Sequence, residues 1–252
     1  MKTSFKEKIS KLGKFILNGI FPSHIKCIFC GNELSETCTN NCCEECKESL
    51  PFITSCCDRC GLPMNEQHLE VCSSCKRQNY NFVKARSSFA YTDQPLALVR
   101  KIKFRNKKIV IPAMAKFLFD TFKAWNINVD LVTFVPMHPE SEKVRGFNQS
   151  QILAEEFSRL SNLPVTYCSK KILNTPNQRD LSFEKRKENI KDAFIVNPEK
   201  RSEIKGKTIL IIDDVFTTGA TTNELSKTLI SAKVKDCYVL TFAHTIFNST
   251  SN

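Results

Sequence analysis

The sequence lacks the long apolar runs and repeats that mark membrane or solenoid proteins. No run approaches about 18 apolar residues, so we expect no transmembrane helix. Lys11 and Lys14 interrupt the first apolar stretch and no small-residue cleavage site follows it, so we expect no secretory signal. The second half contains no repeat of about 20–50 residues, and no low-complexity segment. These absences favour a cytoplasmic globular protein.

The composition is that of a folded globular chain, but the charge is unbalanced. Of 252 residues, 41% are hydrophobic and 25% are charged, which suits one medium domain plus a small appendage. The formal net charge is +11. Such a charge favours polyanionic partners, which are nucleic acid, phosphorylated metabolites or an anionic membrane surface. Charge alone does not choose among the three.

Cysteine is abundant and unevenly placed. Of the 13 cysteines, only Cys168 and Cys237 lie beyond the first third of the chain. A secreted disulfide scaffold would need an export signal and usually an even number of cysteines, so we expect reduced thiols instead.

Four Cys-x-x-Cys pairs within residues 27–75 indicate metal binding. Two cysteines at this spacing contact one face of a tetrahedral ion, and a second pair completes the coordination. Gly31 and Gly61 each follow a cysteine, where a tight turn needs permissive backbone. We therefore predict a module over residues 23–80 with structural Zn²⁺ in two four-cysteine sites, paired in sequence order or interleaved, from Cys27, Cys30, Cys43, Cys46, Cys57, Cys60, Cys72 and Cys75. Cys38, Cys42 and Cys56 remain unassigned.

Residues 1–22 are expected to form a separate basic amphipathic helix. Lysines alternate with apolar residues at helical spacing, namely Phe5, Ile9, Leu12, Phe15, Ile16 and Ile20. This helix either packs on its own protein or docks on a membrane or a partner.

The remainder, residues 83–247, alternates predicted strands with predicted helices. Apolar, β-branched runs indicate strands over 89–91, 131–135, 208–212 and 237–242, and amphipathic patterns indicate helices over 96–104, 111–125, 148–160 and 221–231. Such alternation predicts an α/β fold with a mostly parallel sheet and helices on both faces.

The sharpest motif spans residues 209–221. A buried strand ends at two acids, Asp213 and Asp214, and a loop of small residues then leads into a helix. Ligands of parallel α/β sheets bind beyond the carboxyl ends of the strands. Backbone N–H groups at the helix start can surround a phosphate, and this loop comprises Thr217, Thr218, Gly219, Ala220 and Thr221. Two adjacent carboxylates would repel a simple anion, so the ligand should also carry a diol or Mg²⁺.

This stretch resembles the 5-phosphoribosyl-1-pyrophosphate (PRPP) signature of type I phosphoribosyltransferases. The resemblance implies that Asp213 and Asp214 address the ribose hydroxyls and that residues 217–221 hold the 5-phosphate, with Mg²⁺ accompanying PRPP. It also implies a type I phosphoribosyltransferase-like fold.

Further segments resemble the ComF/ComFC competence family over nearly the whole chain, about Cys27 to Ala243. They are Val-Pro-Met-His at 135–138, Arg-Gly-Phe-Asn-Gln-Ser at 145–150, and Gln178 to Phe194, combined with the cysteine block. The family implies a cytoplasmic role in natural transformation, handling incoming single-stranded DNA beside other competence proteins such as a helicase and a membrane channel. Peripheral binding at the inner face of the membrane is compatible with that role. The resemblance supplies no accepted phosphoribosyl acceptor.

Several basic residues are candidates for this chemistry. Arg145 is placed to contact the pyrophosphate end of PRPP, unless it is a solvated surface residue. Arg179 and Arg186 lie in a polar stretch that is either a mobile lid or a helix surface. His138 either contacts phosphate or caps a loop.

A basic run is the candidate nucleic-acid contact, with Phe104 either stacked on a base or buried. Its predicted members are Arg100, Lys101, Lys103 and Arg105, with Lys107 and Lys108 following. The alternative is a solvated helix face.

Three functions remain open from the sequence. The chain is a phosphoribosyltransferase with Asp213, Asp214 and Arg145 as catalytic residues, or a nucleic-acid-binding module that PRPP or a nucleotide regulates. The third is a scaffold that rests on the helix over residues 1–22 alone.

Overall fold

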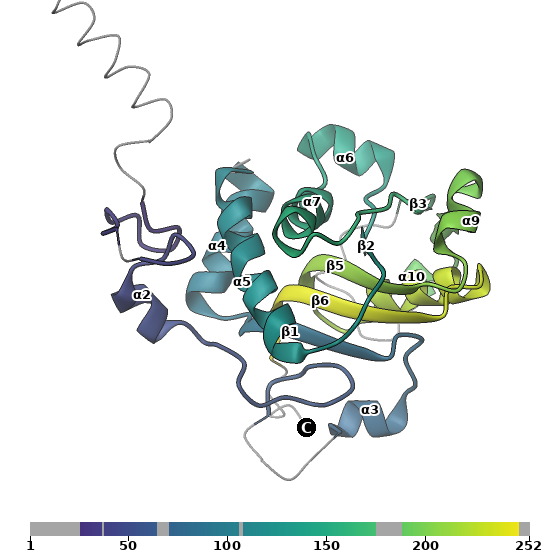
Figure 1. Ribbon diagram of the computed structural model, residues 1–252, viewed down its shortest axis with the longest axis horizontal. Coiled ribbons are helices and arrows are strands. Elements are labelled where there is room, and N and C mark those ends of the chain that lie inside the picture. Colours follow the sequence, from purple (N-terminus) through teal and green to yellow (C-terminus); the bar gives the residue numbers. More distant parts are fainter. Residues whose placement is uncertain (1–25, 37, 65–70, 106–107, 175–187, 247–252) are drawn as a thin grey trace, which may run out of the picture. The chain divides into compact units, whose positions relative to one another are not determined.

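The computed structural model describes residues 26–36, 38–64, 71–105, 108–174 and 188–246 (Figure 1). It divides into two compact units, Met1–Ser49 and Leu50–Asn252. The predicted helix over 1–22 and the stretch with Arg179 and Arg186 lie outside the described residues. In the described ranges, no helix has the length and apolar character that a membrane span requires.

The first unit contains a cysteine turn and the short helix α2 (Glu44–Ser49). In the turn, Gly31 donates its N–H to the Cys27 carbonyl and adopts a φ of 86°. That left-handed conformation is the reason for a glycine at this position.

The second unit is built on a four-stranded parallel sheet with the order β1-β6-β5-β2. Its strands are β1 (Lys84–Ala90), β2 (Leu131–Phe134), β5 (Thr208–Phe216) and β6 (Asp236–His244). The predicted parallel sheet is confirmed.

Strands β1 and β5 are longer than their apolar runs suggested. The Lys84–Ser88 part of β1 is mostly polar, yet Ser87 and Ser88 are buried, and the Ser87 hydroxyl lies 2.6 Å from that of Thr241. Strand β5 continues through both acids, because Asp213 to Phe216 keep their pairing with β6.

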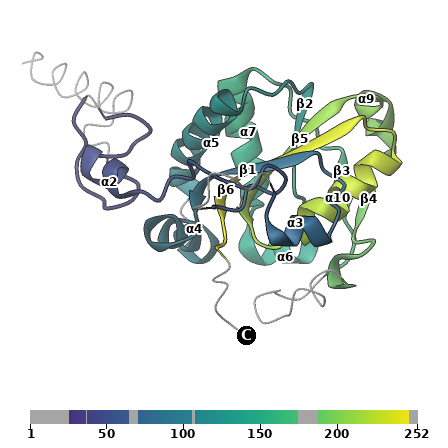
Figure 2. The same ribbon diagram turned by 90° about the horizontal axis from the view of Figure 1, so that it is seen from below.

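Helices cover both faces of this sheet (Figures 1 and 2). Helix α5 (Ile111–Trp125) packs on β1 and β6, and α7 (Gln149–Ser161) packs on β2 and β5. On the opposite face, α10 (Ala220–Ser231) contributes Leu225 and Leu229 to a core with Ile209 and Ile211 of β5. The remaining helices are α3 (Ser73–Arg77), α4 (Asp93–Arg105), η1 (Lys108–Val110), α6 (Pro139–Arg145), η3 (Pro198–Lys200) and α9 (Arg201–Ile204).

Several elements have no counterpart among the predictions, among them two short strands and a helix. Strands β3 (Ser169–Lys171) and β4 (Phe194–Val196) form a separate antiparallel pair that packs beside α10, and α6 follows β2. Each strand is three residues long, which is too short for a period-2 pattern to be read.

The second cysteine segment belongs to the unit of the sheet. Arg59 accepts a hydrogen bond from the Ala85 N–H at its carbonyl oxygen, 2.8 Å away, so this segment covers the edge strand β1. Cys57, Cys60 and Cys72 share a core with Phe82 and the apolar side chains of β5. The predicted limits of the zinc module, 23–80, remain a prediction.

Candidate functional site

Two adjacent carboxylates lie at the C-terminal end of β5, where a parallel sheet binds its ligands. The Ser150 hydroxyl donates to Asp213 Oδ1 over 2.6 Å, and the N–H of Asp214 donates to the same oxygen over 2.9 Å. Burial, together with the neighbouring Asp214 charge, nevertheless raises the pKa of Asp213 to about 7. Asp213 therefore changes its charge near neutral pH.

Asp214 is buried and paired with a cation. Its Oδ2 lies 2.7 Å from Lys103 Nζ of α4 and accepts a hydrogen bond from Gln149 Nε2 at 3.2 Å. Burial opposes the charge of Lys103, but the Asp214 carboxylate outweighs it, and the pKa of Lys103 is raised. The ion pair thus fixes the positions of the Lys103 and Asp214 side chains.

Arg145 joins this network indirectly. Its Nη1 donates to Gln149 Oε1 over 2.9 Å, so one glutamine connects the guanidinium with Asp214. Gly146 ends α6 with a φ of 83°, and Asn148 caps α7. The chain therefore turns between Arg145 and Gln149. Sequence reasoning singled out Arg145 in this segment and missed Gln149 and Ser150. The signal that could have identified both residues is their position in the first turn of α7, which follows the end of β2.

The loop after the acids leads into α10 through a left-handed residue. Gly219 is the N-cap of α10, with a φ of 74°. A Cβ at this position would lie 2.5 Å from a ring carbon of Phe216 and 3.0 Å from one of Tyr80. The Thr218 hydroxyl accepts a hydrogen bond from Ala220 N at 3.3 Å. Such a loop at a helix N-terminus can hold an anion.

A cavity of about 440 Å³ is lined by residues of β3, of α6 and of the start of α7, and neither acid lines it. Lys171, whose pKa burial lowers, lines it and is close enough to Asp213 to feel its charge. Ser169 and Asn197 also line it, and each has a buried side-chain oxygen for which the described residues provide no hydrogen-bond partner. His138 lines the same cavity, while its Nδ1 accepts a hydrogen bond from Glu140 N and caps α6.

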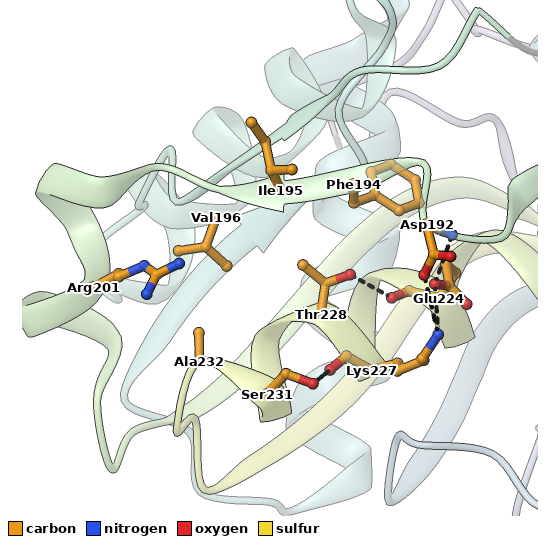
Figure 3. Close-up of a pocket in the computed structure, with 10 residues that line it drawn as sticks. All are labelled: Asp192, Phe194, Ile195, Val196, Arg201, Glu224, Lys227, Thr228, Ser231 and Ala232. Atoms are coloured by element: carbon orange, nitrogen blue, oxygen red, sulfur yellow. Dashed lines mark hydrogen bonds and ion pairs between the residues drawn. The ribbon is translucent and has the colours of Figure 1, made fainter.

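A second cavity, of about 380 Å³, lies between β4 and α10 (Figure 3). Three of its charged side chains are engaged with one another, because Lys227 contacts both Asp192 and Glu224. No residue of the segment 213–221 lines either cavity. The first cavity is lined by Lys171, which senses the charge of Asp213, and by Asn148 at the start of α7, whose Ser150 donates to Asp213, so we assign the candidate site to the acids and this cavity.

The predicted nucleic-acid residues divide between two roles. Arg100 is exposed on α4, whereas Lys103, one turn further, is engaged with Asp214. Lys101 is half-buried on the same helix, and the side chain of Arg105 lies outside the described residues. Nucleic-acid binding by this run remains a prediction.

The eight predicted metal ligands gather as two groups in sequence order. Cys27, Cys30, Cys43 and Cys46 form one group and Cys57, Cys60, Cys72 and Cys75 the other, with the sulfurs of each within 4.8 Å of one another. The N–H of Asn32 points to Cys30 Sγ at 3.5 Å and that of Cys72 to Cys57 Sγ at 3.2 Å. Four soft sulfur ligands with such N–H support fit a closed, structural zinc site.

The fold and the site together define an α/β protein with two adjacent carboxylates before a loop at a helix N-terminus, and with two four-cysteine clusters. A family model described as "Double zinc ribbon domain" matches residues 16–76. That match covers both clusters and agrees with structural zinc.

Curated relatives extend over most of the chain. "Competence protein F" of Haemophilus influenzae is 27% identical, covering 86% of this chain and 95% of its own. "Competence protein ComFC" of Bacillus subtilis is 28% identical, with 81% and 88% covered. "DNA utilization protein YhgH" of Escherichia coli is 26% identical, with 75% and 83% covered. These homologues confirm the resemblance to the competence family.

Solved structures match a smaller part. An allosteric regulatory enzyme of purine biosynthesis covers 52% of this chain and 26% of its own, with 17% identity and a TM-score of 0.36. A hypoxanthine phosphoribosyltransferase from Staphylococcus aureus covers 53% and 62%, with 16% identity and a TM-score of 0.33. Scores of this size do not establish a common fold, so the parallel sheet stands on its own strand pairings.

Proposed function

We propose that this chain is a PRPP-binding, phosphoribosyltransferase-like protein that acts in DNA uptake and natural transformation. The observation that carries the proposal is the pair Asp213 and Asp214 near the C-terminal end of β5, which is followed by a glycine-containing loop at the start of α10. Carboxylates suit the ribose diol, and the backbone N–H groups of residues 217–221 suit the 5-phosphate. The competence and DNA-utilisation relatives support the biological setting.

The chemistry of the proposal is a displacement at C1 of the ribose. A lone pair of the acceptor forms a bond to C1 while the bond from C1 to the pyrophosphate oxygen breaks. Pyrophosphate leaves with the electron pair of the broken bond. Arg145 would stabilise the leaving group, and the ion pair with Lys103 would hold the side chain of Asp214 in position. Bound Mg²⁺ would neutralise charge on the pyrophosphate. The cavity lined by Lys171 and Asn148 would accommodate the part of the ligand that extends past the ribose.

Calorimetry tests the proposal. PRPP with Mg²⁺ is titrated into the zinc-loaded full chain and into an Asp213→Asn/Asp214→Asn variant, and released pyrophosphate is assayed in the same samples. We expect binding by the wild type and its loss in the variant. Absence of wild-type binding would refute the site.

Asp213 gives the proposal a pH signature. Its pKa of about 7 means that the carboxylate form, which accepts hydrogen bonds from the diol, grows as the pH rises through neutrality. We expect PRPP affinity to increase from about pH 6 to about pH 8. The Asp213→Asn variant is the control for titration of the ligand's own phosphates, and an equal pH profile in both proteins would contradict the role of Asp213.

The second candidate is a non-catalytic nucleic-acid-binding module with PRPP or a nucleotide as regulatory ligand. Helix α4 favours it, because Arg100 is exposed on the same helix from which Lys103 reaches Asp214. It predicts that affinity for single-stranded DNA falls steeply with salt. It also predicts that an Arg100→Ala/Lys101→Ala variant binds DNA more weakly. Salt-independent affinity would contradict this candidate, and acceptor-dependent pyrophosphate release would favour the enzyme.

A further inference from the structure

A tyrosine from the cysteine-rich segment contacts the proposed phosphate loop. Tyr80 follows α3, which begins directly after Cys72, and its side chain is buried. Its hydroxyl donates to the carbonyl oxygen of Thr218 over 3.1 Å. A Cβ added on Gly219 would also lie 3.0 Å from a carbon of the Tyr80 ring. The loop is therefore in contact with Tyr80 on one side.

This contact determines where the loop directs its amide groups. The carbonyl of Thr218 and the N–H of Gly219 belong to one planar trans peptide, so they point in opposite directions. Because the carbonyl points toward Tyr80, the Gly219 N–H points away from it. An N–H aimed this way at a helix N-terminus is a donor for an anion.

The second cysteine cluster holds Tyr80 in position. Arg59, which lies between Cys57 and Cys60, donates from Nη2 to the Tyr80 carbonyl over 2.7 Å. Gln78, the C-cap of α3, donates from Nε2 to the Tyr80 hydroxyl. Both donors thus come from segments that the cluster Cys57, Cys60, Cys72 and Cys75 would hold together.

A neighbouring pair of contacts ties the same segment to α10. Asn223 Oδ1 accepts hydrogen bonds from the backbone N–H of Asn81 at 2.6 Å and from its side-chain amide at 3.1 Å. The loop and the first turn of α10 are therefore both attached to residues 80–81.

We propose that the second cysteine cluster positions the phosphate loop through Tyr80, so that metal loading of this cluster and phosphate binding by residues 217–221 are coupled. The proposal rests on the proposed function for its ligand. Tyr80 is a positioning residue in it. Since coupling between two sites is reciprocal, phosphate should also strengthen metal retention at this cluster.

The first test compares Tyr80→Phe with Tyr238→Phe in the zinc-loaded full chain. Phenylalanine keeps the ring that packs on Gly219 and removes the hydroxyl. Tyr238 is the matched control, because its ring packs against Trp125. We measure hydrogen exchange of the amides of residues 217–221 and the affinities for inorganic phosphate and PRPP. In Tyr80→Phe we expect faster exchange and about a fivefold loss of affinity, the effect of one hydrogen bond.

The second test removes one cysteine from each cluster. Cys75→Ser should speed exchange at residues 217–221, whereas Cys43→Ser in the other cluster should leave it unchanged. Unchanged exchange in both Tyr80→Phe and Cys75→Ser would overturn the coupling. If the wild type binds neither phosphate nor PRPP, the proposed function fails, and the exchange data still decide whether Tyr80 positions the loop.

Discussion

The two cysteine clusters have the same turn in different surroundings. In both, a cysteine carbonyl accepts the N–H of a left-handed glycine, from Gly31 to Cys27 in the first and from Gly61 to Cys57 in the second. A methyl group added at Gly31 would meet no atom of the described residues within 4 Å, whereas one added at Gly61 would lie 2.7 Å from the Ala85 carbonyl oxygen of β1. One motif can thus stand in a small unit or be built into the core of a larger one.

The difference predicts unequal consequences for stability. Cys57, Cys60 and Cys72 share the core of the sheet, so loss of the second cluster should affect the whole unit from Leu50 onward. The first cluster lies in the other unit, and one of its cysteines, Cys30, is exposed.

The largest effect is expected from Cys60→Ala. It removes a metal ligand and leaves a gap in a buried cluster, so we expect the free energy of unfolding of the sheet unit to fall by more than about 4 kcal/mol. Cys30→Ala is the matched change, and it should leave the unfolding of the sheet unit within about 0.5 kcal/mol of wild type. Chemical denaturation followed by far-ultraviolet circular dichroism measures both. Equal losses would break the contrast between the clusters.

A middle-sized effect is expected from the two glycines. Alanine at either position is strained by the positive φ, which costs about 1 kcal/mol. At Gly61 the methyl group must also displace the backbone of β1, so Gly61→Ala should cost about 3 kcal/mol or more, against about 1 kcal/mol for Gly31→Ala. Thermal unfolding of the zinc-loaded protein distinguishes them. Similar melting shifts would show that the second turn does not depend on contact with β1.

The smallest effect concerns the ion pairs between the second turn and β1. Asp58 lies 2.7 Å from Lys84 and 2.9 Å from Arg86, and the Lys84 hydrogen bond is the main reason that the pKa of Asp58 is lowered. The three side chains are partly exposed, so Asp58→Asn should cost at most about 1 kcal/mol.

The pH dependence of this pair has a definite sign. Because the pKa of Asp58 is lower in the folded state than its ordinary 3.8, its stabilisation is present above that value and is lost as the pH falls below it. Denaturation midpoints measured from about pH 7 down to about pH 3 should converge between wild type and Asp58→Asn at the acid end. A difference that persists in acid would mean that Asp58 acts through packing instead.

Most of the parallel sheet followed from periodicity, and the exceptions have physical reasons. Helix α5 begins and ends at the predicted residues, Ile111 and Trp125, since its apolar face is continuous. The first part of β1 was missed because two of its buried residues are serines, whose hydroxyls form hydrogen bonds with Thr241 of β6 and Thr121 of α5. A polar strand of this kind has no apolar period to detect.

The residues proposed to contact the ligand could be predicted from the sequence, whereas the residues that hold them in position could not. Asp213, Asp214 and the loop at 217–221 lie within nine residues of one another in the sequence, so a single motif singled them out. Lys103 was assigned to a basic surface, and only the fold brings its ammonium to Asp214. Tyr80 could not be connected with Thr218 from the sequence, since the two lie far apart along the chain.

The sequence by itself determined the local features of this protein: the cysteine pairs, the glycine turns, and a strand with two acids in its C-terminal half, followed by a loop at a helix N-terminus. Each depends on residues within a few positions of one another, whose backbone geometry is set locally. The tertiary structure alone decided that one cysteine cluster joins the core of the sheet, and that Lys103, Gln149 and Tyr80 reach the site. These contacts arise from packing between distant segments, which local spacing does not encode.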